Sequence, residues 1–145
     1  MEIYTTGFTK KTAEQFFDAL RRVGIRRLID IRLNNSSQLA GFSKRDDLAY
    51  FLRVICDAAY QHEPLLAPTQ AMLDEYRKEK TGWELYERRF LALMRERRIE
   101  AQIARSLFAT PTVLLCSEAT PEHCHRRLVA EYLRDHWGNV TINHL

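Results

Sequence analysis

The start of the chain contains two short strand-like runs, and between them lies a stretch with apolar residues at helical spacing. The runs lie at residues 3–6 and 28–31, and a capping box at residues 12–15 precedes the stretch between them. The apolar residues at helical spacing are Phe16, Phe17, Leu20 and Val23. Gly24 follows them as a natural helix end. This order predicts a strand, a helix and a second strand, and the crossover makes the two strands parallel.

The middle of the chain continues this alternation. Residues 32–42 are polar and are expected to form a long loop, a common location for functional residues. Ser43 or Asp46 is expected to cap a helix, and residues 60–62 to form a short strand after it. The predicted buried face of that helix consists of Leu48, Phe51, Leu52, Ile55 and Ala59, with Cys56 as a core residue on or beside it.

The second half of the chain predicts three more helices and two more strands. Thr69 is expected to cap one helix, and a second capping box at residues 81–84 to open another. The predicted core stripe of this longer helix is Trp83, Tyr86, Phe90, Leu93 and Met94. Residues 111–116 are apolar without alternation, as expected of a central strand covered on both faces. Thr120 and Pro121 predict the start of the last helix, and residues 139–142 predict a final strand.

These elements predict an α/β fold. We expect a three-layer sandwich, in which a mostly parallel sheet of about five strands carries helices on both faces. The 145 residues suit a single domain, residues 1–145, and 46% hydrophobic with 28% charged residues is ordinary for a globular protein. No stretch approaches 18 apolar residues, so no membrane span is expected. An odd set of three cysteines without an export signal favours a reducing cytoplasm.

Arginine dominates the positive charge of the chain. The formal net charge is only +3, but 17 of the 22 basic residues are arginine, and ten of these occur as adjacent pairs. The pairs are Arg21–Arg22, Arg26–Arg27, Arg88–Arg89, Arg97–Arg98 and Arg126–Arg127. Arginine binds phosphate oxygens in pairs, but acidic residues at helical spacing favour solvated, ion-paired faces for most of these clusters. The charge alone is a weak signal for nucleic acid.

Polar and reactive residues follow four of the predicted strands. They are Thr6 and Gly7, then Asp30 and Arg32, then His62, and finally Cys116 with Glu118. In parallel sheets ligands bind outside the carboxyl ends of the strands. We therefore expect these residues to meet at one edge of the sheet and form a site.

The segment from Cys116 to Arg127 has the highest density of reactive and ionisable side chains in the chain. Thiols near a helix N-terminus have a lowered pKa, so Cys116 or Cys124 is a candidate nucleophile, with His125 as base. Glu118 is the candidate orienting or acid group. Neither thiol has an arginine six positions later, which excludes the loop of cysteine phosphatases, and seven residues between the thiols exclude a thioredoxin-type motif. No Walker loop or dinucleotide-binding glycine pattern occurs.

Two alternatives to a catalytic thiol remain open. Cys116, Cys124, His125 and His62 offer four ligands for zinc. Adjacent helical residues point about 100° apart and no paired cysteine spacing occurs, so no metal or other cofactor is predicted. In the second alternative, both thiols are inert core residues and His125 makes a structural hydrogen bond.

The same residues resemble a known family. Cys116 and Glu118, followed by Cys124-His125-Arg126, are similar to the C-terminal signature of the domain of unknown function 488 family. Other landmarks agree in order across essentially the whole chain. They are residues 6–9, Asp30-Ile31-Arg32, the Tyr60-x-His62-x-Pro64-x-Leu66 segment and residues 140–144. The chain departs from the family pattern at residues 33–37 and 66–68, both beside the expected site. The resemblance implies where the site lies and leaves its reaction open.

The leading hypothesis is an enzyme that acts on a phosphate-bearing ligand, a nucleotide or nucleic-acid component. Arg32 and Arg126, with the helix expected to start at Thr120, would hold the anion. Thr6, Gly7, Asp30 and His62 complete the expected ligand-binding set. The alternatives are a nucleic-acid-binding module without catalysis and a metal-stabilised interaction domain.

Overall fold

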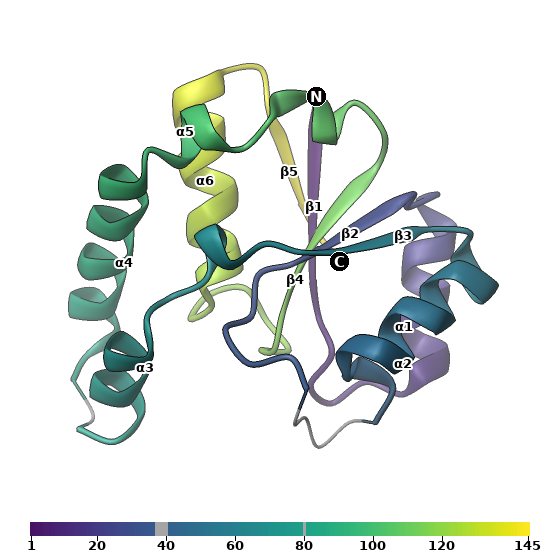
Figure 1. The fold of residues 1–145 in the computed structure, drawn as a ribbon, viewed down its shortest axis with the longest axis horizontal. Helices are drawn as coiled ribbons and strands as arrows, with labels where there is room; N and C mark the ends of the chain where they lie inside the picture. Colours follow the sequence, from purple (N-terminus) through teal and green to yellow (C-terminus); the bar gives the residue numbers. More distant parts are fainter. Residues whose placement is uncertain (37–40, 80) are drawn as a thin grey trace.

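A five-stranded sheet forms the middle layer of the protein (Figure 1). The computed structural model describes residues 1–36, 41–79 and 81–145. All strand pairings in the sheet are parallel, and the strand order is β3-β2-β4-β1-β5. The strands are β1 (Glu2–Gly7), β2 (Arg27–Asp30), β3 (Ala59–His62), β4 (Thr112–Cys116) and β5 (Thr141–His144). Every residue of the central β4 is buried, which confirms its prediction from an apolar run without alternation.

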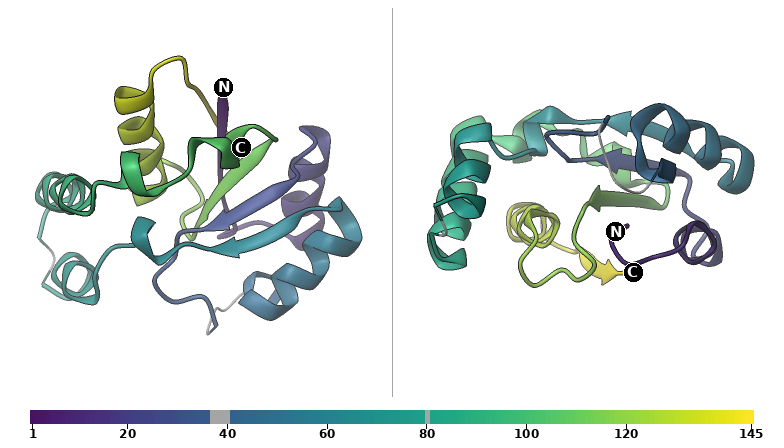
Figure 2. Two further views of the ribbon diagram at one scale, coloured as in Figure 1. Left: turned by 45° about the horizontal axis from the view of Figure 1, so that its top comes forward. Right: turned by 90° about the horizontal axis from the view of Figure 1, so that it is seen from below.

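Helices cover both faces of this sheet, which confirms the predicted three-layer α/β sandwich. The helices are α1 (Ala13–Arg22), α2 (Arg45–Phe51), α3 (Gln70–Arg77), α4 (Trp83–Arg97), α5 (Ile99–Gln102) and α6 (His125–Trp137). Figure 1 shows α1 and α2 on one side of the strands and α3 to α6 on the other. Figure 2 shows α3 and α4 as a pair beyond the strands. None of the described helices is long and apolar enough to cross a membrane.

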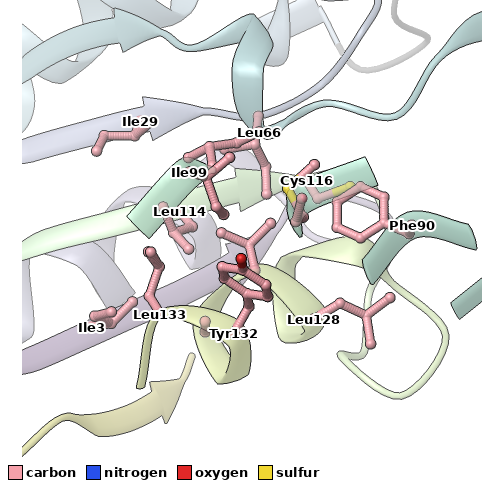
Figure 3. Close-up of a cluster of buried hydrophobic side chains, with 14 of the residues drawn as sticks. Ile3, Ile29, Leu66, Phe90, Ile99, Leu114, Cys116, Leu128, Tyr132 and Leu133 are labelled. Carbon is pink, nitrogen blue, oxygen red and sulfur yellow. The ribbon is translucent and has the colours of Figure 1, made fainter. Parts of the chain in front are cut away.

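The alternation of side chains along β4 divides the core in two. Leu114 and Cys116 belong to the cluster on the α6 side, whereas Val113 and Leu115 belong to the cluster on the α1 side. Figure 3 shows the first cluster, in which strand residues such as Ile3 and Leu114 meet residues of α6. Cys116 and Phe90 belong to the same cluster. Cys116, a candidate site residue, is therefore part of the packed core.

Side-chain caps start two of the helices as expected. Thr12 accepts a hydrogen bond from the Gln15 N–H at 3.1 Å, and the Gln15 side chain accepts one from the Thr12 N–H at 2.9 Å. This completes the predicted capping box of α1. Thr69 caps α3 by accepting from the Met72 N–H at 3.2 Å.

Two predicted caps are wrong. The N-cap of α4 is Gly82, which has no side chain to cap with, and the Thr81 hydroxyl instead donates to the Glu75 carbonyl. The N-cap of α2 is Lys44, whose side chain makes no cap hydrogen bond. In α2 a backbone group takes the place of a side-chain cap, because the N–H of Arg45, its first residue, donates to the Asn35 carbonyl at 2.8 Å.

The predicted buried face of the second helix is also partly wrong. Leu48 and Leu52 are buried, but the Ile55 side chain is 38% exposed and Ala59 is an exposed residue of β3. A π-helical turn over Leu52–Cys56 replaces regular α-helix and moves the following residues out of helical spacing. Cys56 is half-buried against the core. Residues 37–40 of the predicted loop lie outside the described residues.

The predicted start of the last helix is four residues too early. Thr120 and Pro121 lie in bends, and α6 begins at His125 with Cys124 as its N-cap. The turn just before this segment is held by Thr9, which follows β1 and donates from its N–H and its hydroxyl to the Ser117 carbonyl. After Pro121 a single turn forms, closed by the Cys124 N–H donating to the Pro121 carbonyl at 3.3 Å, and it does not continue as helix because the Cys124 backbone is extended.

The capping box of α1 provides a test of local stability. Thr12→Ala removes a side-chain acceptor and should lower the free energy of unfolding by about 1 kcal/mol, measured by urea denaturation. Lys44→Ala is the matched control, because Lys44 occupies an N-cap without a side-chain hydrogen bond, and should change stability by less than about 0.5 kcal/mol. Equal effects of the two substitutions would contradict this assignment.

Candidate active site

The carboxyl ends of β1, β2, β3 and β4 lie side by side at one edge of the sheet. The register pairs Gly7 with Cys116, and Asp30 with both Leu115 and His62. Successive side chains point to opposite faces of the sheet. The expected site residues therefore separate into three groups, which differ in their surroundings.

The first group consists of Cys116, Cys124 and His125. Cys116 is the last residue of β4, and His125 is the first residue of α6. The Cys116 Sγ lies 3.2 Å from the His125 Nδ1, and the His125 Nε2 lies 2.8 Å from the Ile31 carbonyl oxygen. A carbonyl only accepts, so Nε2 carries the hydrogen and Nδ1 turns its lone pair to the thiol.

Cys124 completes this group because it lies outside the helix. Its φ and ψ of −137° and 137° are extended, so it does not follow the helical spacing assumed for its neighbour His125. The Sγ atoms of Cys116 and Cys124 and a ring nitrogen of His125 all lie within 4.8 Å of one another. The expectation that the side chains of Cys124 and His125 diverge by about 100° is therefore wrong.

The two thiols in this group are not equivalent. Burial raises the pKa of Cys116, but a hydrogen bond with Cys124, the Ser117 backbone and the Arg126 charge together hold that pKa below its usual value. The same hydrogen bond, followed by burial, raises the pKa of Cys124. Burial lowers the pKa of His125, which favours the neutral imidazole. Cys116 is thus the thiol that ionises first, with Cys124 as the hydrogen-bond donor to it.

The second group consists of Asp30, Arg32 and His62. Arg32 donates two hydrogen bonds to the Asp30 carboxylate, at 2.9 and 2.8 Å, and both side chains are buried. His62 Nε2 lies 2.8 Å from the Arg32 carbonyl oxygen. Outside this group, Tyr60 donates to Asp30 at 2.6 Å and the Ile31 N–H donates to the Leu115 carbonyl at 3.1 Å. These bonds hold the segment that carries the Ile31 carbonyl.

The third group consists of Arg126, Thr6, Gly7 and the backbone of Glu118. Arg126 is fully buried and its Nη1 donates to the Glu118 carbonyl, while its Nε and Nη2 have no partner in the described part of the chain. Thr6 accepts from Lys11 at 3.3 Å. A Cβ atom on Gly7 would overlap the Glu118 carbonyl oxygen. Glycine is therefore required where the turn after β4 crosses β1.

An open pocket lies beside the first group. Its volume is about 110 Å³, several times the roughly 10–15 Å³ that a cavity needs to hold one water molecule. The pocket is therefore large enough for more than a single water. The expected site residues in its wall are Arg32, Cys116, Glu118, Cys124 and His125. Thr6, Gly7, Asp30, His62 and Arg126 are not among the described residues that line it. The Glu118 side chain is exposed, and the Ile31 carbonyl takes the orienting position that Glu118 was expected to fill.

The rest of the pocket wall includes residues that were not predicted to belong to the site. They are Leu73, Tyr76, Arg77, Trp83, Tyr86 and His123. Trp83 stacks between Tyr86 and His123, with ring centroids 5.2 and 5.1 Å away. The prediction of Trp83 and Tyr86 as core residues is confirmed, because Tyr86 is buried in the core cluster and the half-buried Trp83 packs against it. Both residues also line the pocket, which helical spacing alone does not reveal. The exposed Arg77 places a positive charge in this wall.

Comparison with known families agrees with the resemblance seen in the sequence. Residues 12–133 match the family described as "Domain of unknown function DUF488". Because the match spans more than half of the chain, the chain belongs to this family. Comparison with curated proteins and with solved structures gave no match.

The close approach at Gly7 leads to a stability prediction. Gly7→Ala should lower the free energy of unfolding by about 1–3 kcal/mol, because its Cβ meets the backbone of Glu118 and that turn must move. Gly41→Ala is the control, since no atom of residues 1–36, 41–79 and 81–145 comes within 4 Å of the added Cβ apart from its chain neighbours. Thermal and urea unfolding measure both. A Gly7→Ala protein as stable as Gly41→Ala would contradict the close approach.

Proposed function

We propose that this member of the DUF488 family is an enzyme that acts on a phosphate-bearing ligand, a nucleotide or a component of a nucleic acid, with Cys116 as its nucleophile. The proposal depends on one observation, the 3.2 Å contact between the Cys116 Sγ and the His125 Nδ1 at the inner end of an open pocket. A nucleophile, a base and a group that orients the base are the minimum for this chemistry. The Ile31 carbonyl is the orienting group.

The geometry defines a path for one proton. The Cys116 proton moves to His125 Nδ1, and the thiolate forms a bond to the electrophilic atom of the ligand. As the bond to the leaving group breaks, the imidazolium returns the proton to that group. Hydrolysis then reverses the roles: water gives its proton to Nδ1, its oxygen bonds to the ligand atom as the bond to sulfur breaks, and Nδ1 returns the proton to the Cys116 thiolate. Cys124 stabilises this thiolate as a hydrogen-bond donor.

The buried polar groups act on this chemistry as positioning residues. Asp30, Arg32 and His62 hold the backbone on both sides of Ile31, and so fix the carbonyl that orients His125. Gly7 and Arg126 hold the turn that carries Glu118. Asp30, His62, Gly7 and Arg126 are not among the described residues that line the pocket, so we expect them to act through the backbone and not by contact with the ligand.

Three features of the pocket support an anionic, aromatic ligand. The exposed Arg77 lines the pocket and supplies positive charge, and the buried Arg32 also lines it. The N-terminus of the 13-residue helix α6 lies at Cys124 and adds the positive end of its dipole. The ring of the exposed His123, stacked on Trp83, offers an aromatic surface to a nucleobase. Glu118 is placed to donate or accept a proton at the pocket mouth.

The ion pairs of the arginine clusters favour an enzyme over a nucleic-acid-binding module. Arg26 pairs with Asp57 at 3.1 Å, and Arg127 pairs with Glu131 at 2.8 Å. Arg89 pairs with Glu75. These pairs neutralise charge that a binding module would direct at phosphates. A small ligand in the pocket requires only the cations of the pocket wall.

The reactivity of Cys116 tests the nucleophile. Iodoacetamide should alkylate Cys116 faster than Cys124 and Cys56 at neutral pH, and His125→Ala should slow this reaction more than about tenfold. Peptide mass spectrometry assigns the rate to each thiol. Alkylation of Cys116 no faster than of Cys56, or an unchanged rate in His125→Ala, would remove the basis for a covalent step.

Protection from alkylation tests the ligand class. The four ribonucleoside 5′-monophosphates should include one that protects Cys116, whereas the matching nucleosides, which lack the phosphate, should protect much less. Arg77→Ala should weaken this protection about tenfold or more, because a hydrogen bond to a charged group contributes about 1.5–3 kcal/mol. Lys78→Ala is the control, since Lys78 is an exposed neighbour that pairs with Asp74 outside the pocket. Equal protection by nucleosides and nucleotides would contradict a phosphate-bearing ligand.

A further inference from the structure

We propose that Cys116, Cys124 and His125 form a zinc-binding site with one coordination position open to the pocket. The convergence of two sulfur atoms and one ring nitrogen within 4.8 Å carries this inference. It goes beyond the proposed catalytic role of Cys116, because it depends neither on a phosphate-bearing ligand nor on a covalent step.

The spacing of the three atoms is close to that of a tetrahedral zinc site. With Zn–S near 2.3 Å and Zn–N near 2.0–2.1 Å, tetrahedral ligand atoms lie about 3.5–3.8 Å apart. The Cys116 Sγ and the His125 Nδ1 are already 3.2 Å apart. All other separations in the group are at most 4.8 Å, so side-chain movements of about 1 Å or less produce the required geometry.

The groups around these atoms already have the arrangement of an outer coordination shell. A histidine that binds a metal usually donates its other ring N–H to a carbonyl or carboxylate, which fixes the ring and its tautomer. The His125 Nε2 makes this bond to the Ile31 carbonyl at 2.8 Å, and Nδ1 is left to bind. Arg126 Nη1 lies 3.8 Å from the Cys124 Sγ and stabilises negative charge on that sulfur.

The donor atoms select the kind of metal. Two thiolates and one imidazole suit zinc, whereas magnesium and calcium require oxygen ligands. The two thiolates also balance the charge of Zn²⁺. All three residues line the pocket, so a fourth ligand would come from a bound molecule or water, as in sites with three protein ligands.

Zinc in this site would occupy the sulfur that the proposed nucleophile uses. The zinc-bound and the reactive forms of Cys116 therefore exclude each other. Zinc should slow alkylation of Cys116 and leave alkylation of the distant Cys56 unchanged, and a chelator should reverse the effect.

The experiment titrates reduced, metal-free protein with Zn²⁺ against a chromophoric chelator, and with Co²⁺ as a spectroscopic substitute. Wild-type protein and Cys56→Ser should bind one ion per chain, with thiolate-to-cobalt charge-transfer bands and tetrahedral d–d bands. Cys116→Ser, Cys124→Ser and His125→Ala should each bind at least about 100-fold more weakly. Circular dichroism shows which variants are folded, and Cys124→Ser changes only one atom.

Two results would overturn this inference. One is that wild-type protein binds no stoichiometric zinc, and the other is that folded Cys124→Ser binds zinc as tightly as Cys56→Ser. Neither result affects the nucleophile, which is tested by alkylation of the metal-free protein. Conversely, slow alkylation of metal-free Cys116 would contradict the nucleophile and leave the zinc site in place.

Discussion

The hydrogen bond from the His125 Nε2 to the Ile31 carbonyl determines what the rest of the site can do. Because the carbonyl can only accept, this 2.8 Å contact holds the hydrogen on Nε2 and leaves the Nδ1 lone pair directed at Cys116. A base for a thiol and a ligand for a metal both require that lone pair. With the opposite tautomer, Nδ1 would carry the hydrogen, and the imidazole would lose both functions.

Several buried polar interactions fix the position of the Ile31 carbonyl. Ile31 lies between Asp30 and Arg32, whose buried ion pair is closed by two hydrogen bonds. His62 contacts the Arg32 carbonyl from the neighbouring strand. A buried ion pair contributes little net stability but strongly fixes geometry. In this protein the geometry it fixes is the backbone whose Ile31 carbonyl orients the His125 imidazole.

The parts of the site that sequence predicts are those encoded by residue type and strand order. An apolar run without alternation identified β4, and the rule for parallel sheets placed Cys116, Asp30 and His62 at one edge. The Ile31 carbonyl was missed because every residue has one, so no residue type marks it. The extended backbone of Cys124 was missed because Thr120 and Pro121 resemble a helix start, whereas in the structure this segment forms bends and a single turn before α6 begins at His125.

The extended conformation of Cys124 is what allows the site two uses. In a helix that began at Thr120, Cys124 would point away from its neighbour His125. As an extended N-cap it instead places its thiol next to Cys116, so that the neutral Cys124 thiol donates a hydrogen bond to the Cys116 thiolate. Replacement of that shared proton by a divalent cation would leave the same three side chains in place. In the proposed zinc site a proton and a zinc ion therefore compete for the same two sulfur atoms. The concentration of free zinc would determine the fraction of Cys116 that is able to react.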